Sequence, residues 1–204
     1  MSTQASSTTP DKPQVVKVWD PLVRIFHIGL ITFFVAAWVS AEESQALHEW
    51  AGYTVAALIV FRLFWGLFGT PHARFSDFIY SPRQIVSYLV SLPTRRVKHY
   101  LGHNPAGGAM VIAMLVTLSL LTLSGMAMVA EEGAGPLAAL GFTGLGGEAL
   151  EEVHEALANL MVLLVGLHIV GVVVSSFLHH ENLPAAMLHG RKTVQPQADS
   201  GDAS

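Results

Sequence analysis

Four long apolar stretches set the strongest constraint on what this chain can fold into. They cover about residues 22–41, 47–69, 105–130 and 151–178, and each is near or above the ~20 residues that a helix needs to cross membrane hydrocarbon. Within membrane hydrocarbon every backbone N–H and C=O group must be hydrogen-bonded inside the protein, so only helices and closed β-barrels can span it. The four stretches lack the alternation of apolar and polar residues that is typical of a barrel strand. With 51% hydrophobic and 13% charged residues, the sequence predicts an all-α fold, an integral membrane four-helix bundle.

The polar segments complete this prediction. Ser81 and Pro82 predict the N-cap and first turn of a short amphipathic helix between the second and third spans, because apolar residues then recur at helical spacing. We expect this helix to lie on the cytoplasmic membrane surface. Residues 1–16 and 191–204 are predicted to be disordered cytoplasmic tails around one domain, residues 17–190, and the first tail does not resemble a cleaved signal.

The charges predict the orientation of the bundle. Ten of the eleven Lys and Arg residues lie in the two tails, at the start of the first span, or in the second connection. By the positive-inside rule, both termini and that connection face the cytoplasm of a bacterial inner membrane. The other two connections and their flanks carry glutamates and no basic residue. The basic residues are Lys12, Lys17, Arg24, Arg74, Arg83, Arg95, Arg96, Lys98, Arg191 and Lys192.

Four histidines fall within the spans, at two depths. His154 and His168 are fourteen residues apart in the fourth span, which corresponds to a rise of about 21 Å on one helical face. With the predicted orientation, His48 matches the outer depth of His154, and His27 matches the inner depth of His168. Imidazoles are expensive in lipid, so each pair is expected to have a ligand or partner.

An opposed imidazole pair inside a helix bundle is suited to a haem iron with both axial positions taken. Two such pairs predict two haems, stacked along the membrane normal. The chain has no cysteine, so a covalently attached haem and thiolate-bound metals are excluded. Zinc is the alternative metal, but it prefers four ligands, and no span has a carboxylate well inside.

Three residues near the histidines are candidates for cofactor binding. Gly52 and Gly171 lie about one turn after His48 and His168 and would leave room for a planar ring system, although close helix packing explains them equally well. Arg62 follows His48 by fourteen residues and would meet a haem propionate at the inner level. The alternative for Arg62 is a side chain that extends to the headgroups.

The sequence also resembles a known family. The residues that carry the resemblance are "VWDPLVRIFHIG", "LHEWAGY", "FRLFWGLFG", "GHNPAGG" and "VHEALANLMVLLVGLHIVG", and it covers roughly residues 17–190. They resemble the prokaryotic cytochrome b561 family, which is similar to the b-type cytochrome subunits of membrane nickel–iron hydrogenases. The resemblance implies two non-covalent b haems, the inner one ligated by His27 and His168 and the outer one by His48 and His154.

The family's activity implies electron transfer between the quinone pool and a redox partner. The partner would be a periplasmic cytochrome or a catalytic subunit. We expect the protein to contact membrane lipid and not nucleic acid, and a homodimer is possible. His103 and Asn104, in "GHNPAGG", would bind a propionate or line a quinone pocket; alternatively they only begin a helix. The remaining alternatives are a haem-b anchor subunit of a larger reductase, dehydrogenase or hydrogenase, a metal-ion transporter, and a haem sensor or assembly protein.

Overall fold

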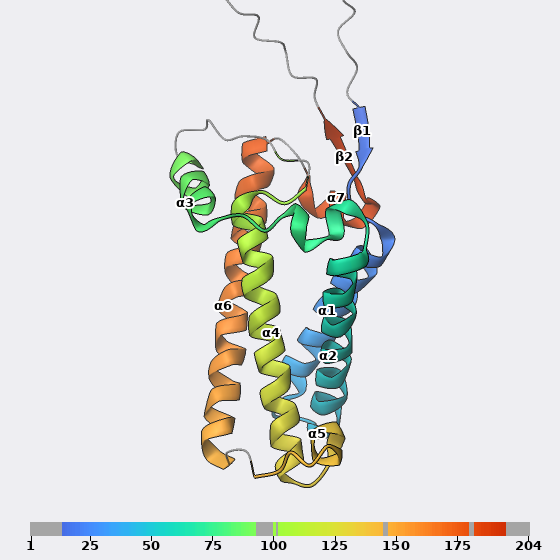
Figure 1. The fold of residues 1–204 in the computed structure, drawn as a ribbon, viewed down its shortest axis with the longest axis vertical. Coiled ribbons are helices and arrows are strands. Elements are labelled where there is room, and N and C mark those ends of the chain that lie inside the picture. The colour runs from blue at the N-terminus through green and yellow to red at the C-terminus, as the bar shows by residue number, and fades with distance from the viewer. Residues whose placement is uncertain (1–13, 93–99, 101, 145–146, 180–181, 195–204) are drawn as a thin grey trace, which may run out of the picture.

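The computed structural model describes residues 14–92, 100, 102–144, 147–179 and 182–194. Within them, four long helices run side by side: α1 (Pro21–Ser40), α2 (Gln45–Phe68), α4 (Pro105–Glu131) and α6 (Gly147–His179) (Figure 1). All four are long and apolar enough to cross a membrane. The predicted four-helix membrane bundle is therefore confirmed, with the fourth helix beginning at Gly147 instead of about residue 151.

The helices pack in a chain of neighbours. The closest contacts in the described residues join α1 to α2, α2 to α4, and α4 to α6, whereas α1 and α6 are not a closely packed pair. An apolar core lies at mid-height, where α2, α4 and α6 meet, and consists of Val55, Ile59, Leu118, Leu121 and Met161. Most other large apolar side chains of the spans are exposed in the isolated chain, as expected for surfaces that face lipid.

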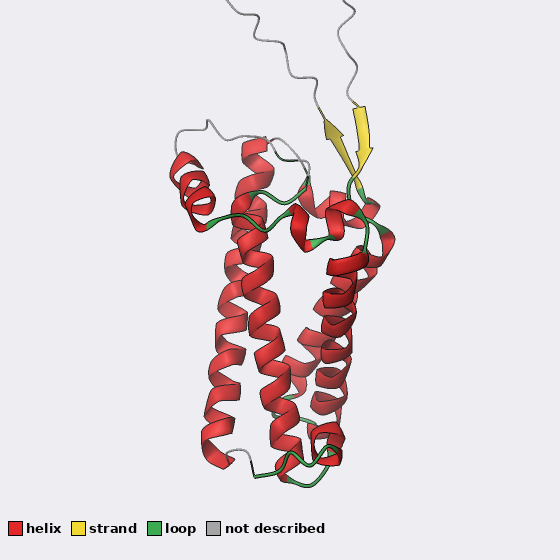
Figure 2. Cartoon of the chain, in the orientation of Figure 1, coloured by secondary structure: helices red, strands yellow, loops and turns green. Residues whose placement is uncertain are grey.

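Short helical elements lie across one end of the bundle. Figure 2 draws them in red, as it does the long helices. Two 3₁₀ turns, η1 (Pro71–Ala73) and η2 (Phe75–Asp77), follow α2. A Cβ at Gly66 would lie 2.2 Å from the Phe75 ring, and one at Gly108 would lie 2.2 Å from the Phe78 carbonyl oxygen. Glycine at these two positions therefore lets the turns lie directly against α2 and α4.

The amphipathic helix predicted between the second and third spans is α3 (Pro82–Ser91). Ser81 caps it as expected, and its hydroxyl and the Gln84 side chain form a reciprocal capping box. Val86, Leu89 and Val90 are exposed, which leaves α3 an unpacked apolar surface at this end of the bundle. That surface suits a helix lying at a membrane boundary.

A small β ribbon departs from the expectation of unstructured tails. Strand β1 (Gln14–Lys17) pairs antiparallel with β2 (Arg191–Val194), so both described chain ends lie at one end of the bundle (Figure 1). Helix α7 (Leu183–His189) leads into β2 through Gly190, whose φ of 79° favours glycine. The rest of the predicted tails, residues 1–13 and 195–204, lies outside the described residues, as do Arg95, Arg96 and Lys98 of the basic connection.

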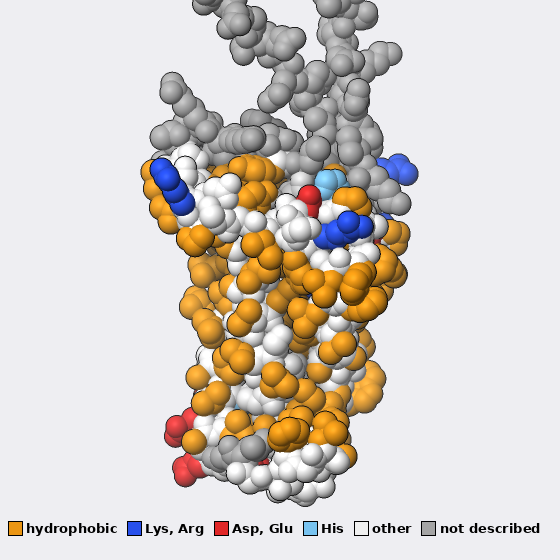
Figure 3. All heavy atoms as spheres, viewed as in Figure 1, with side chains coloured by type: hydrophobic (Ala, Val, Ile, Leu, Met, Phe, Trp, Pro, Cys, Tyr) orange, Lys and Arg blue, Asp and Glu red, His pale blue; other side chains and the backbone are white. Residues whose placement is uncertain are grey.

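Charged side chains gather at the two ends of the molecule, and the shaft between them is mostly apolar (Figure 3). In the face shown, Lys and Arg lie at the end that carries α3 and the ribbon, where acidic atoms also appear beside a histidine, and the opposite end carries Asp or Glu side chains and no Lys or Arg. The opposite end also carries the short helix α5 (Gly135–Ala139). The predicted orientation of the chain in the membrane depends on this segregation.

Asp20 joins the start of α1 to the end of α2. One carboxylate oxygen accepts the Val23 backbone N–H at 2.8 Å and so caps α1, while the other accepts the Trp65 indole N–H at 3.0 Å and the Thr70 hydroxyl at 2.5 Å. Burial raises the pKa of the Asp20 carboxyl, but these hydrogen bonds, led by the one from Thr70, outweigh burial and hold that pKa below its ordinary value.

Replacing Asp20 should loosen this junction. We expect Asp20→Ala to lower the free energy of unfolding by about 1–2 kcal/mol, because the cap of α1 and the hydrogen bonds from Trp65 and Thr70 are lost. Since the folded pKa lies below the unfolded one, the stabilisation by Asp20 is complete above the unfolded pKa and is lost as the pH falls through the folded pKa. Thermal unfolding in detergent across the acid range measures both effects, and Asp20→Asn should lose the pH dependence.

Asp77→Ala is the matched control. Asp77 is an exposed carboxylate at the same end of the bundle, paired with His72 at 3.0 Å, and an exposed pair contributes little to stability. An equal loss of stability in the Asp20 and Asp77 variants would contradict the role given to Asp20.

Candidate functional site

The structure brings the four span histidines together as two pairs. His27 of α1 faces His168 of α6 with ring centroids 6.4 Å apart, and we call this the inner pair. His48 of α2 faces His154 of α6 with centroids 6.1 Å apart, and we call this the outer pair. The pairing expected from depth alone is thus the arrangement found. Helix α6 contributes one imidazole at each level because its two histidines share a face.

Both separations suit a metal ion between two imidazoles. With each metal–nitrogen bond at about 2 Å and each ring nitrogen about 1.2 Å from its ring centre, two collinear ligands place the ring centres about 6.4 Å apart. The centroid distances of 6.4 and 6.1 Å are close to that value. A structural zinc site needs more ligands than two. The described residues contain no group of three or more His, Cys, Asp or Glu side chains that could hold a metal ion. The donor sets therefore fit bis-histidine haem iron.

The outer histidines are oriented by hydrogen bonds at Nδ1. His48 Nδ1 lies 2.8 Å from the Ala37 carbonyl oxygen, which can only accept, so this nitrogen carries the proton. His154 Nδ1 lies 3.0 Å from the Ser124 hydroxyl oxygen. These contacts leave Nε2 of each ring as the available metal ligand, the usual arrangement in which a second hydrogen bond fixes the tautomer of a ligating histidine.

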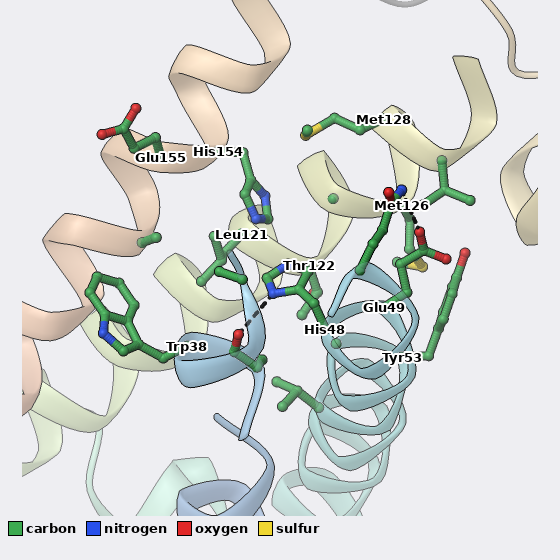
Figure 4. Close-up of a pocket in the computed structure, with 18 of the residues that line it drawn as sticks. Trp38, His48, Glu49, Tyr53, Leu121, Thr122, Met126, Met128, His154 and Glu155 are labelled. Carbon is green, nitrogen blue, oxygen red and sulfur yellow. Dashed lines mark hydrogen bonds between the residues drawn. The ribbon is translucent and has the colours of Figure 1, made fainter. Parts of the chain in front are cut away.

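A cavity of about 1000 Å³ contains the outer pair. Figure 4 shows His48 and His154 pointing toward one another within it. Gly52 lines the cavity, and a Cβ at this position would meet nothing within 4 Å, which is the open space expected beside a ligand. Apolar and thioether side chains line the depth of the cavity, and carboxylates line its mouth: Glu42, Glu43, Glu49, Glu132, Glu151 and Glu155.

The inner pair has a different environment. His27 Nδ1 is buried and has no hydrogen-bond partner within the described part of the chain. Such a nitrogen in a membrane interior is a cost unless something binds the imidazole. A Cβ at Gly171, one turn after His168, would meet nothing within 4 Å. A buried ring nitrogen of this kind is suited to an imidazole that binds a metal ion through its other nitrogen.

Arg62 is a buried cation close to the inner level. Phe61, which precedes it, packs against Phe26, which precedes His27, at 6.4 Å between ring centroids. Arg62 is 4% exposed, and its guanidinium donates to the Ala73 carbonyl oxygen at 3.0 Å and lies 5.1 Å from the centre of the Phe75 ring. Among the described residues, no carboxylate reaches ion-pair distance of it. A buried guanidinium of this kind is suited to an anionic group of a ligand.

His103 and Asn104 lie at the same end of the bundle. The Asn104 side chain accepts the Gly107 backbone N–H at 2.8 Å and caps α4, so the helix-start interpretation holds for this residue. The His103 ring lies between Trp19 and Phe78, with centroids 4.8 and 4.7 Å away. Neither residue belongs to the two histidine pairs.

Met161 fills the space between the two levels. It lies seven residues from both His154 and His168, on the same face of α6, and it is only 2% exposed within the core formed with α2 and α4. The two pairs are therefore separate sites with an apolar layer between them.

Sequence reasoning missed Ser124 and the aromatic rings over Arg62. The Ser124 contact depends on how α4 and α6 align, which the spacing within one helix does not reveal. A hydroxyl followed by glycine within the apolar third span, at Ser124 and Gly125, is the signal that could have identified it.

Comparison with protein families yields one match over most of the chain. A family model described as prokaryotic cytochrome b561 matches residues 18–190. Neither the curated proteins nor the solved structures give a match.

Filling the outer cavity should separate cofactor binding from folding. We expect Gly52→Leu to fold normally, because its Cβ meets nothing, and to bind less haem per chain, because the larger side chain occupies the space beside His48. Gly166→Leu is the control, since that position is exposed and a Cβ there also meets nothing within 4 Å. Haem quantified per purified chain tests the prediction, and equal haem content in the two variants would contradict it.

Proposed function

The chain belongs to the prokaryotic cytochrome b561 family, and from that premise we propose that it transfers electrons across the membrane through two bis-histidine b haems. Membership makes the chain a multi-pass b-type membrane cytochrome with haem b as its cofactor. The finer proposal assigns His27 and His168 to the inner haem, and His48 and His154 to the outer haem. The observation that carries it is the pair of facing imidazoles at each of two levels.

Each part of the chain has a definite task in this proposal. Haem b supplies a one-electron iron couple when bound, and the protein supplies ligation, spacing and electrostatics. Helix α6 sets the spacing, since fourteen residues correspond to a rise of about 21 Å. Two histidines at each haem would complete the coordination of its iron and would thereby disfavour oxygen chemistry. The layer around Met161 keeps the interval between the sites free of water.

The proposed exchange partners are the quinone pool and a second redox protein. Quinone is apolar and enters from lipid, and the aromatic setting of His103 at the inner end supports contact there. The carboxylates around the outer cavity favour a basic periplasmic partner, because complementary charge speeds encounter. We place the end that carries the β ribbon on the cytoplasmic side of a bacterial inner membrane, because the basic residues of the described chain gather at that end.

Histidine variants test the haem assignment. His168→Ala and His27→Ala should each abolish the same low-spin b haem, and His154→Ala and His48→Ala should each abolish the other, because each pair shares one iron. The measurement is a reduced-minus-oxidised spectrum with haem quantified per chain. Two haems in the unaltered protein and one in each variant are expected; one haem in the unaltered protein would contradict the two-level arrangement.

Arg62 variants test the anionic contact at the inner level. We expect Arg62→Gln to weaken retention of the inner haem about tenfold, because the buried positive charge opposite the propionates is lost, and Arg62→Lys to weaken it less. The outer haem of the same molecule serves as the internal reference. Arg83→Gln, at an exposed position of α3, is the control, and equal loss of both haems from Arg62→Gln would indicate a general effect on the bundle.

A further inference from the structure

Ser124 stands out among the hydroxyl side chains of α4. The hydroxyls of Ser119 and Thr122 bond to carbonyl oxygens of their own helix, at 2.7 and 2.9 Å, which satisfies them locally. The Ser124 hydroxyl does the same with the Leu121 carbonyl, at 2.9 Å, and in addition lies 3.0 Å from His154 Nδ1. Ser124 thus brings a side-chain hydroxyl of α4, a helix that supplies no proposed iron ligand, to the outer pair.

The direction of this hydrogen bond follows from the groups involved. A hydroxyl has one proton, and the Leu121 carbonyl oxygen can only accept, so the Ser124 hydroxyl donates to that carbonyl. Its oxygen then accepts a proton from His154, which places the hydrogen on Nδ1. The result is a short chain from imidazole N–H to hydroxyl to backbone carbonyl, with His154 Nε2 turned toward His48.

Gly125 allows the His154 ring to approach. A Cβ at this position would lie 3.0 Å from His154 Cε1, which is tighter than most contacts of a Cβ atom, and 3.5 Å from Nδ1, which is an ordinary contact. The Ser124 hydroxyl and Gly125, at consecutive positions of α4, therefore both lie beside the His154 imidazole. The hydroxyl holds the edge of the ring, and the glycine leaves room for it.

The two levels differ in this support. Both outer histidines donate from Nδ1, His154 to Ser124 and His48 to the Ala37 carbonyl. At the inner level, His27 Nδ1 has no acceptor in the described residues. A hydrogen bond donated from Nδ1 makes the ligating Nε2 more basic, and a more basic ligand stabilises the more positive, oxidised iron.

We propose that Ser124 is a positioning residue of the outer site, one that fixes the tautomer of His154 and lowers the redox potential of the iron bound there. The proposal rests on the function proposed above, because it assumes a haem iron between His48 and His154. The iron gains one electron on reduction, and no bond in the protein forms or breaks. Ser124 acts through His154 and does not touch the iron.

Potentiometric titration of the purified full-length haem protein tests this role. In Ser124→Ala we expect the outer midpoint potential to rise by the equivalent of a tenfold change in preference for oxidised over reduced iron, about 59 mV for one electron. The inner potential should stay unchanged. Ser124→Thr keeps an accepting hydroxyl and should restore the original value, and Ser119→Ala, which removes a hydroxyl bonded only to its own helix, should leave both potentials as they were.

Electron paramagnetic resonance provides a second readout. Gly125→Ala adds a methyl group against the His154 ring and should change the low-spin ferric signal of the outer haem alone. Loss of only the outer haem from Ser124→Ala, with retention in Ser124→Thr, also supports the positioning role. An unchanged outer potential with both haems bound, an equal shift at both levels, or equal loss of both haems overturns it.

The two proposals fail in distinguishable ways. An unaltered protein that binds fewer than two haems contradicts the proposed function before any Ser124 variant is measured. If the two haems respond to the histidine variants as expected but the outer midpoint potential is the same in Ser124→Ala as in the unaltered protein, only the role of Ser124 is contradicted.

Discussion

The arrangement of this protein depends on the need to satisfy imidazoles inside hydrocarbon. A ring nitrogen there has no water to bond, so each histidine is kept only where another group meets it. Helix α6 carries two such rings fourteen residues apart, and α1 and α2 each place a ring opposite one of them. The separation of α1 from α6 and the cavity around the outer pair leave space beside the facing rings.

The two levels have opposite electrostatic surroundings. Near the inner pair is a buried guanidinium, Arg62, without a carboxylate partner in the described chain. Around the mouth of the outer cavity stand several glutamates. Helix α6 thus places two imidazoles in dissimilar environments. The difference arises from Arg62 of α2 near one pair and, near the other, from carboxylates of several segments that include Glu151 and Glu155 of α6 itself.

The sequence was sufficient for the parts of the fold that repeat a local pattern. The four spans follow from length and hydropathy, α3 follows from Ser81, Pro82 and its apolar spacing, and the motifs indicated the family; all of these are confirmed. The grouping of the histidines followed from depth, because a membrane aligns helices along one axis. Their role as iron ligands stays a prediction.

Other features depend on contacts between distant segments and could not be read locally. The ribbon joins Gln14 to Val194, and four-residue strands have no strong pattern of their own. The Ser124 contact needs the rotation of α4 against α6, and the place of Arg62 beneath Phe75 needs the path of the turns after α2. Such information lies in tertiary packing, which hydrophobic periodicity does not encode.

The contact between the two ends of the chain has a consequence for how the protein is made. Arg24 donates to the carbonyl oxygens of Met187 and Leu188, and the Val18 and Trp19 backbone N–H groups donate to Gly190. A ribosome releases the N-terminal part of a chain first, so α1 enters the membrane while the residues that complete its end are still unsynthesised. These contacts can form only after α7 and Gly190 have been synthesised, so a nascent chain that stops before α7 lacks the hydrogen bonds that hold the start of α1.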